Sequence, residues 1–145
     1  MEEDVTMFAN SSWGRNLDIL QRSMNVSMIR QNVGANNIAN ADTPGFKRSY
    51  VNFESGLARA LESERRPRAF VESLTHERHI PFERPTDYRS VEPRRVVDWE
   101  TTAKNNGNNV DIEVESMNML NNMLSYQLMS QSVSEQFNRM NIVLA

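Results

Sequence analysis

Apolar side chains follow a helical period over two long stretches, one near each end of the chain. In the first, from about Ser12 to Asn40, they recur every three or four residues and fall on one stripe of a helix. This stripe consists of Trp13, Leu17, Leu20, Met24, Met28, Gln31, Ala35 and Ile38. A smaller set on nearly the opposite side consists of Ile19, Val26, Ile29 and Val33. The pattern predicts a long helix with two apolar sides, which begins after an N-cap at Ser11 or Ser12.

The residues after this stretch predict an abrupt end to the helix. Pro44 disfavours helical geometry at Thr43, and Pro44 and Gly45 suit the two central positions of a type II turn. Asn40 is a residue type that tolerates the left-handed conformation of a helix C-cap. We therefore expect the helix to stop at Asn40, with that residue in the left-handed region, and the chain to turn at Pro44 and Gly45.

The second stretch, from Val110 to Ala145, contains neither proline nor glycine. Its apolar positions alternate steps of four and three, which is the heptad seam of a coiled coil, and we expect them to pack against helices or subunits. This seam consists of Met119, Met123, Tyr126, Ser130, Val133, Phe137, Met140 and Leu144. A second stripe on the other side consists of Met117, Leu120, Leu124, Leu128 and Ile142. Because two helices packed once against each other cover only one stripe each, we expect other subunits to cover the remaining stripes.

The middle of the chain, residues 47–107, lacks a sustained period. Asn52 suits the N-cap of a short amphipathic helix that ends near Glu62 and carries Phe53, Leu57 and Leu61 on one face. Prolines and many charged residues follow, which favours extended chain and loops with at most short strands. The predicted fold is mainly α, with long terminal helices that pair as an antiparallel coiled coil or helical hairpin, joined by this loop-rich middle. The expected segments are 1–46, 47–107 and 108–145, of which the two ends form one structural domain.

Composition and motifs give little support to catalysis or ligand binding. The chain has no cysteine and a formal net charge of -3, so it offers no thiolate metal site and no strong attraction to nucleic acid. His76 and His79 are its only histidines, whereas a structural zinc site needs about four ligands. We expect no catalytic residue, no metal, no cofactor and no small-molecule substrate.

Two further features bear on location and partners. The acidic start of the chain lacks the apolar segment of a Sec signal peptide, and no stretch approaches the ~20 apolar residues of a membrane span. Arginines alternate with aromatic residues between Arg65 and Arg95, a pattern also found in nucleic-acid binding. Acidic residues nearly balance these arginines, so we favour a solvated or intersubunit loop with ion pairs and expect no nucleic-acid partner.

Residues 35–48 resemble the N-terminal signature of flagellar basal-body rod and hook proteins. The matching residues are Ala35, Asn36, Asn37, Ile38, Ala39, Asn40, Thr43, Pro44, Gly45 and Phe46. Residues 75–80, residues 106–111 and the pair Tyr126-Gln127 are also similar to segments of the short, proximal rod members of this family. The Arg-rich segment from Arg65 to Arg95 departs from the family pattern.

The resemblance implies a structural subunit of the proximal rod, the drive shaft of the flagellar basal body, that self-assembles into a helical tube and transmits torque. It also implies export to the periplasmic rod through the flagellar type III system, without a Sec signal peptide. The implied partners are copies of itself, other rod proteins, the rod-base adapter protein, the inner-membrane ring and the flagellar export gate. Two alternatives stay open: another rod subunit of the same family, and a soluble helical adapter or export chaperone that would be absent from purified basal bodies.

Overall fold

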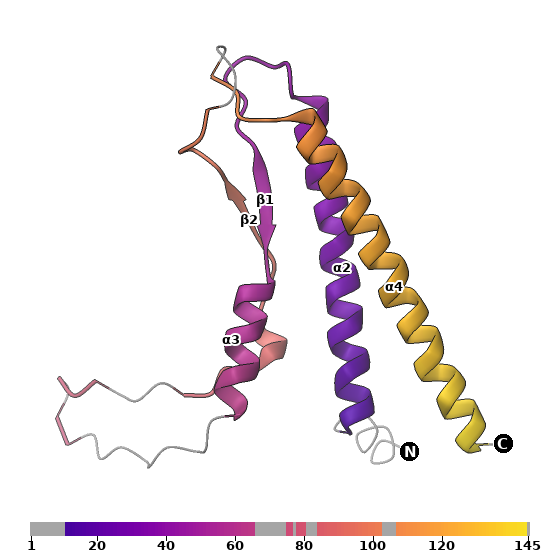
Figure 1. Ribbon diagram of the computed structural model, residues 1–145. Helices are drawn as coiled ribbons and strands as arrows, with labels where there is room; N and C mark the ends of the chain where they lie inside the picture. The colour runs from indigo at the N-terminus through magenta and orange to yellow at the C-terminus, as the bar shows by residue number, and fades with distance from the viewer. Residues whose placement is uncertain (1–10, 66–74, 77, 81–83, 103–106, 145) are drawn as a thin grey trace. The chain divides into compact units, whose positions relative to one another are not determined.

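The computed structural model describes residues 11–65, 75–76, 78–80, 84–102 and 107–144. The elements along these residues are α2 (Ser12–Ala39), β1 (Ser49–Asn52), α3 (Glu54–Arg65), the 3₁₀ helix η1 (Tyr88–Ser90), β2 (Arg94–Val97) and α4 (Ile112–Leu144) (Figure 1). The predicted mainly α fold, with long helices near both ends and short strands in the middle, is confirmed. The first ten residues and part of the Arg-rich segment lie outside the described residues.

The described residues divide into two compact units, with boundaries between Val51 and Asn52 and between Arg95 and Val96. Unit 1 contains α2, most of β1, the second half of β2, and α4, whereas unit 2 contains α3 and η1. The segments 47–51 and 96–102, which the sequence pattern assigns to the middle, thus belong to the unit of the terminal helices.

Side chains cap both ends of α2. Ser11 is extended, with φ -72° and ψ 160°, and its Oγ accepts a hydrogen bond from Gly14 N at 3.1 Å, so Ser11 is the N-cap. At the other end Asn40 has φ -106° and ψ 12°, so the prediction of a left-handed C-cap is wrong. Asn40 Nδ2 instead donates to Asn36 O at 2.8 Å, and Thr43 N donates to Asn40 O at 3.0 Å. The helix therefore ends in successive turns that use the free carbonyl groups without a left-handed residue.

The predicted turn follows at Thr43–Phe46. Gly45 has φ 74°, and Phe46 N donates to Thr43 O at 3.2 Å. A proline at the second position and a glycine with positive φ at the third are the features of a type II turn, so this prediction is confirmed. The turn redirects the chain from the end of α2 toward β1.

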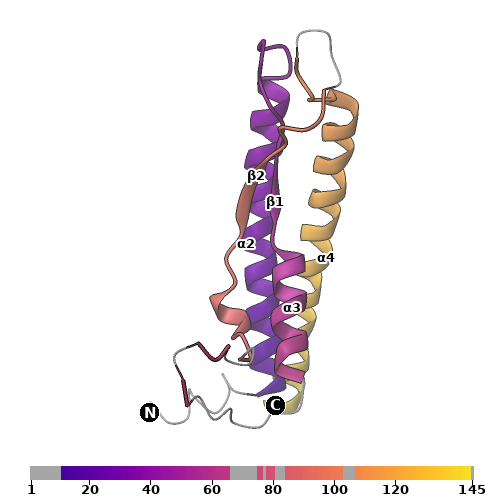
Figure 2. The same ribbon diagram turned by 90° about the vertical axis from the view of Figure 1, so that its left-hand side faces the viewer.

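In unit 1, α2 and α4 pack side by side and run in opposite directions (Figure 1, Figure 2). Their contacts are antiparallel, since the partners on α2 move back toward its start as α4 advances. The facing pairs are Asn37–Glu115, Gly34–Met119, Ser27–Asn122 and Trp13–Phe137. The two long helices therefore form an antiparallel hairpin whose partners lie far apart in the sequence.

On α4 the contacts follow a heptad register that differs in part from the predicted one. The buried or half-buried positions along the seam are Glu115, Met119, Asn122, Tyr126, Met129, Val133, Gln136 and Met140. Met119, Tyr126, Val133 and Met140 are common to both registers. Met123 and Leu144, which the apolar pattern places on the seam, are exposed, whereas Phe137 is 47% exposed but contacts Trp13 of α2 through its ring. Polar residues thus occupy seam positions that the apolar pattern gives to larger side chains.

On α2 two of the observed contact positions also differ from the predicted ones, each by one residue. Ser27 O accepts a hydrogen bond from Asn122 Nδ2 at 2.8 Å, and a methyl group at Gly34 would lie 2.9 Å from Met119 Cγ. Ser27 and Gly34 are buried, whereas Met28 and its heptad successor Ala35 are exposed. The other predicted positions, Leu17, Leu20, Met24 and Ile38, are half-buried. A hydrogen bond and a close approach, neither of which is an apolar signal, therefore set the register of α2.

Side-chain size along the seam explains the spacing of the two helices. Near the start of α4 they approach closely at Gly34, which has no side chain to separate them. At the other end the rings of Trp13 and Phe137 make an edge-to-face contact, with centroids 5.9 Å apart and an interplanar angle of 88°. The helices accordingly diverge toward the end where α2 begins and α4 ends (Figure 1).

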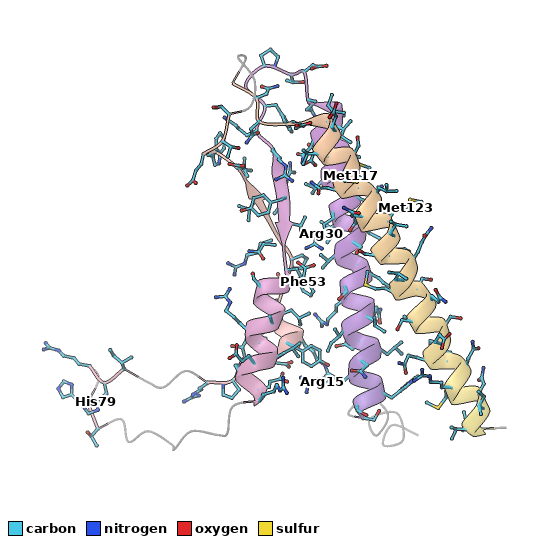
Figure 3. All side chains as sticks on the ribbon, viewed as in Figure 1. Arg15, Arg30, Phe53, His79, Met117 and Met123 are labelled. Atoms are coloured by element: carbon cyan, nitrogen blue, oxygen red, sulfur yellow. The ribbon has the colours of Figure 1, made fainter. Side chains whose placement is uncertain are left out.

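The second apolar side of α2 is largely covered within the chain. Val26 and Val33 on this side are buried, and Arg30 Nη2 donates to Val51 O at 3.3 Å, so β1 lies along the helix here (Figure 3). On α4 the residues that we call the outer stripe, Met117, Leu120, Leu124 and Leu128, are 49–67% exposed. The surplus stripe is therefore exposed on α4, where coverage by other subunits stays a prediction, whereas most of the surplus side of α2 is covered within the chain.

Unit 2 consists of α3 and η1. Leu57 N donates to Phe53 O at 2.9 Å, so Phe53 and not Asn52 holds the N-cap position of α3. Asn52 Oδ1 instead accepts a hydrogen bond from Ser55 Oγ at 2.7 Å. Among the described residues of this unit, the buried side chains are Phe53, Ala60 and Tyr88. The predicted short helix and its apolar face are thus present, with the start displaced by one residue.

We predict that Gly34→Leu lowers the free energy of unfolding of unit 1 by about 1–3 kcal/mol, the usual range for overpacking. The new side chain meets Met119 where α2 and α4 approach most closely. The matched control is Ala35→Leu, which adds a large side chain one residue along at an exposed position and should change stability by less than about 0.5 kcal/mol. Urea unfolding followed by helical circular dichroism measures both. Equal effects of the two substitutions would show that Gly34 does not set the spacing.

Candidate functional site

Six polar residues gather in unit 1 where the end of α2, the segment before β1 and the segment before α4 meet. We call this cluster the polar junction; it consists of Asn37, Arg48, Ser49, Asn108, Asn109 and Glu115. All of them except Arg48 are buried. Buried polar groups are stable only when they are hydrogen-bonded, and the bonds here join residues up to 78 positions apart.

Asn37 lies at the centre of the polar junction. Its Oδ1 accepts a hydrogen bond from Ser49 N at 3.1 Å, and its Nδ2 donates to Ser49 O at 2.7 Å. The side-chain amide thus pairs with the backbone as a neighbouring strand would. Nδ2 also donates to Glu115 Oε2 at 3.1 Å. Asn37 is fully buried, and its amide both donates and accepts hydrogen bonds, so its polar atoms are bonded. An ionised aspartate has no donor and could not form the same hydrogen bonds.

Asn37 also covers the outer edge of β1. β1 and β2 form a two-stranded antiparallel sheet, and Asp98 N extends their pairing by donating to Arg48 O at 2.9 Å (Figure 1). In this register the backbone groups of Ser49 and Val51 point away from β2. Asn37 forms hydrogen bonds with the backbone N and O of Ser49. Arg30 of α2 donates to the backbone O of Val51, as described above. An unpaired strand edge can pair with another chain, and α2 blocks this one.

Glu115 is a buried carboxylate in the first turn of α4, only 3% exposed. One of its oxygens forms an ion pair with Arg48 Nε, and the other accepts the hydrogen bond from Asn37. A buried charge is tolerated when it is paired and its remaining atoms are bonded, and breaking such a pair costs ~3–5 kcal/mol. The start of α4 is therefore held both to the end of α2 and to the segment before β1.

Two asparagines before α4 complete the polar junction. Asn108 Nδ2 donates to Ala41 O at 2.9 Å and to Thr43 O at 2.7 Å, which ties this segment to the chain that follows α2. Asn109 Oδ1 accepts from Arg48 N at 2.6 Å. The segment between β2 and α4 is thus bonded both to the chain that follows α2 and to the residue before β1.

Asp111 precedes α4, which begins at Ile112, two residues after the predicted Val110. Its Oδ1 accepts hydrogen bonds from Glu113 N at 2.9 Å and from Val114 N at 3.3 Å, which makes it the N-cap. The acidic first turn that follows is favourable beside the positive end of the helix dipole. The direction of α4 is therefore set locally by Asp111 and at long range by Glu115.

Asp98 holds a tight turn next to the polar junction. Its carboxylate accepts hydrogen bonds from Thr101 Oγ1 at 2.7 Å, from Glu100 N at 3.1 Å and from Thr101 N at 3.2 Å. The bond from the Thr101 hydroxyl is the main cause that lowers the pKa of Asp98 below its ordinary value of 3.8. Desolvation opposes this effect, whereas the two backbone bonds and the positive charge of Arg48 add to it.

The signature residues have separate structural roles. Asn37 belongs to the polar junction, Pro44 and Gly45 form the turn, and Asn40 closes the end of α2. The exposed signature residues are Ala35, Asn36, Ala39, Thr43, Pro44 and Gly45, and the half-buried ones are Ile38, Asn40 and Phe46. The structure therefore brings only Asn37 of this run into the buried cluster.

The two histidines lie in exposed segments with ring centroids 5.9 Å apart. Within the described ranges, no group of three or more His, Cys, Asp or Glu side chains is arranged to hold a metal ion. None of the helices in the described part of the chain is long and apolar enough to cross a membrane.

The apolar pattern missed Arg48, Glu115 and Asn122, although α4 carried a signal for two of them. Glu115, Asn122 and Gln136 continue the steps of four and three that run through Met119 and Tyr126. Polar residues at heptad positions often fix the register of paired helices, so these three could have been read as seam residues. Arg48 carried no comparable signal, because its partner is 67 residues away.

We predict that the Asp98 carboxyl titrates below 3.8 in the folded protein. Because the folded pKa is depressed, the stabilisation of the turn is present above the pKa of the unfolded chain and is lost as the pH falls through the folded value. NMR titration of the side-chain carboxyl carbon measures the midpoint. Thr101→Val removes the hydroxyl donor and should raise the midpoint toward 3.8; an unchanged midpoint would exclude that hydrogen bond as the main cause.

We predict that Asn37→Asp lowers the free energy of unfolding of unit 1 by at least about 2 kcal/mol, the scale of a lost bond to a buried polar group. The new carboxylate oxygen would face Ser49 O and the Glu115 carboxylate, both of which accept the Asn37 amide in the native chain. Urea unfolding at pH 7 and near pH 4 measures the effect, and the loss should be smaller at the lower pH because a protonated aspartate can donate.

Two variants test whether this loss arises in the polar junction. Asn36→Asp adds the same charge to the same end of α2 at an exposed position, and it should have a much smaller effect. Adding Glu115→Gln to Asn37→Asp removes the facing charge and should recover part of the lost stability. If Asn36→Asp were as harmful as Asn37→Asp, general repulsion at the helix end would be the cause instead.

The chain is similar in sequence to known proteins over most of its length. A family model described as flagella basal body rod protein matches residues 17–47, which cover most of α2 and the turn after it. The flagellar basal body rod protein FlgB of Borreliella burgdorferi is 39% identical over 131 residues, 90% of this chain and 96% of that protein. The FlgB proteins of Bacillus subtilis and Escherichia coli are 32% and 33% identical over 126 and 125 residues, each 86% of this chain and 89% and 88% of the relative. The chain therefore belongs to the FlgB family of flagellar basal body rod proteins.

Proposed function

We propose that the chain is a structural subunit of the proximal rod, in which its helical pair packs against copies of itself and other rod proteins. The observation that carries this proposal is the outer stripe of α4, whose four side chains are 49–67% exposed. A contiguous exposed apolar patch is a surface for protein contact rather than for water. The stripe faces away from α2, since its positions lie on the opposite side of α4 from the seam.

The two helices have different parts in this assembly. α2 is covered on one side by α4 and on another by β1, so its apolar residues mainly hold the subunit together. Among the residues that the structure describes, only the seam of α4 is covered, so its outer side is available to a neighbour. We propose that covering the outer stripe is the main apolar contribution to rod assembly, because the favourable free energy scales with the apolar area removed from water.

The polar contacts between the helices suit a part that transmits torque. Asn122 Nδ2 donates to Ser27 O at 2.8 Å and to Gln31 Oε1 at 3.3 Å, midway along the pair. Together with the polar junction, these bonds oppose sliding of α4 along α2, which apolar contacts alone resist weakly. We propose that the pair packs in the rod as a coiled coil whose register these polar contacts fix.

Membership of the family supports a set of partners and a location. We propose contacts with the rod-base adapter protein, the inner-membrane ring and the flagellar export gate, beside those with other rod subunits. We also propose that the chain reaches the periplasmic rod through the flagellar type III system, as a structural component without catalytic activity or cofactor. Recovery of the chain in purified basal bodies separates this function from that of a soluble adapter or export chaperone.

We predict that Leu124→Asp prevents incorporation into the rod, because a charge in the middle of the outer stripe cannot be covered by an apolar neighbour without a large desolvation cost. The measurement is the amount of chain in purified basal bodies, together with swimming, in cells that carry only the variant. Ser125→Asp is the matched control, since it places the same charge one residue along at an exposed position off the stripe. Normal incorporation of Leu124→Asp would rule out the outer stripe as an assembly surface.

A further inference from the structure

Trp99 is exposed to an unusual degree for its residue type. It is 73% exposed, whereas tryptophan is highly buried on average in folded proteins. Tryptophan is enriched among the residues that dominate the binding energy of protein interfaces. The surroundings of Trp99 therefore decide whether it has such a role.

The turn that carries Trp99 is held from several sides. Asp98 bonds across it to Thr101 through side chain and backbone, as described above. From the chain before α4, Asn109 Nδ2 donates to Asp98 O at 2.9 Å and to Thr101 Oγ1 at 3.0 Å. Lys47 Nζ donates to Thr101 O at 3.2 Å. Because the turn is already ordered, binding through Trp99 loses little conformational entropy.

Trp99 and the outer stripe belong to unit 1 but lie on different sides of it. The segment that follows β2 lies on the side of α2 away from α4 (Figure 1). The outer stripe lies on the side of α4 away from α2. The tryptophan of one chain therefore cannot cover the stripe of the same chain.

We propose that Trp99 of one copy binds to the outer stripe of a second copy. This inference rests on the proposed function and specifies what covers the stripe. Methionine and leucine side chains adapt to an aromatic ring, and sulfur–aromatic contacts are favourable. Charge does not oppose the contact: α4 carries no charged residue from Ser116 to Ser134, so Asp98 and Glu100, which flank Trp99, meet no like charge along the stripe.

This contact is heterologous, because two different patches meet. A heterologous contact repeats from copy to copy and builds a ring or an open helical array, whereas a self-complementary patch ends with a dimer. The stripe is also limited in length. Gln131, Glu135 and Asn138 continue it with polar side chains, so the apolar contact is confined to the part near the start of α4.

The test uses the absence of cysteine in the natural chain. Glu100→Cys places a thiol beside Trp99, and Asn121→Cys places one at the border of the outer stripe, both at exposed positions. Basal bodies purified from cells that carry only the double variant are treated with a mild oxidant and separated under non-reducing conditions. We expect a ladder of dimers, trimers and higher multiples, which the two single variants do not give. Monomers alone, or dimers alone, from the double variant would overturn the proposal.

Two substitutions in the double-cysteine chain identify the contribution of Trp99. Trp99→Ala should reduce the cross-linked fraction by at least about tenfold, the effect expected on removing a central interface residue. Ile80→Ala is the matched control, since Ile80 is 90% exposed and belongs to unit 2. An unchanged ladder with Trp99→Ala would also overturn the proposal. If Leu124→Asp blocks incorporation but the double-cysteine chain gives no ladder, the stripe assembles the rod with a different partner, and the proposed function stands without this inference.

Discussion

The buried hydrogen bonds of Asn37 to Ser49 and Glu115 are the constraint on which the rest of unit 1 depends. One amide fixes the end of α2, the outer edge of β1 and the first turn of α4 at the same point. The packing of the helices then extends from there, through the close approach at Gly34 to the aromatic contact at Trp13. The cluster contains a buried carboxylate, so a partial set of these bonds would be less stable than an apolar core. This makes the arrangement cooperative: the segments are positioned together or not at all.

The sequence predicted the parts of the fold that local chemistry determines. Helical periodicity places both long helices within two residues of their described limits, and a proline followed by a glycine predicts the turn at Pro44 and Gly45. The register of the two helices was harder to predict, because the residues that lie on the seam depend on the side chains and backbone groups of the partner helix. Gly34 faces α4 because it permits close approach, and Asn122 does so because Ser27 O accepts its amide, whereas periodicity alone favours the larger Met28 and Met123. The misplaced C-cap at Asn40 has a similar cause, since bonds to neighbouring carbonyls replaced a left-handed residue.

The polar junction could be predicted only in part. The family signature included Asn37, but its sequence context does not distinguish it from Asn36 and Asn40, which are exposed and half-buried. The distinction comes from the helical period, which puts Asn37 on the same side as Arg30 and therefore against β1. The pairing of Arg48 with Glu115 spans 67 residues, and a single sequence gives no measure of such a distance. A charged residue at a seam position can be predicted to be buried only when the residue that pairs with its charge is known.

A repeating assembly requires that the surfaces of each subunit keep a constant geometry, and the polar junction supplies it. Arg48 and Asn109 hold the turn that carries Trp99, and Arg48 also pairs with Glu115, which holds the start of α4 and with it the outer stripe. The two surfaces lie on different sides of unit 1, so a small change in the angle between them would be multiplied along a stack of subunits. A purely apolar core would hold the same elements together but would permit small rotations and slips, since dispersion contacts are not directional. Directional hydrogen bonds around a buried charge remove that freedom, which explains why a rod subunit has buried polar residues at the point where its two terminal segments meet.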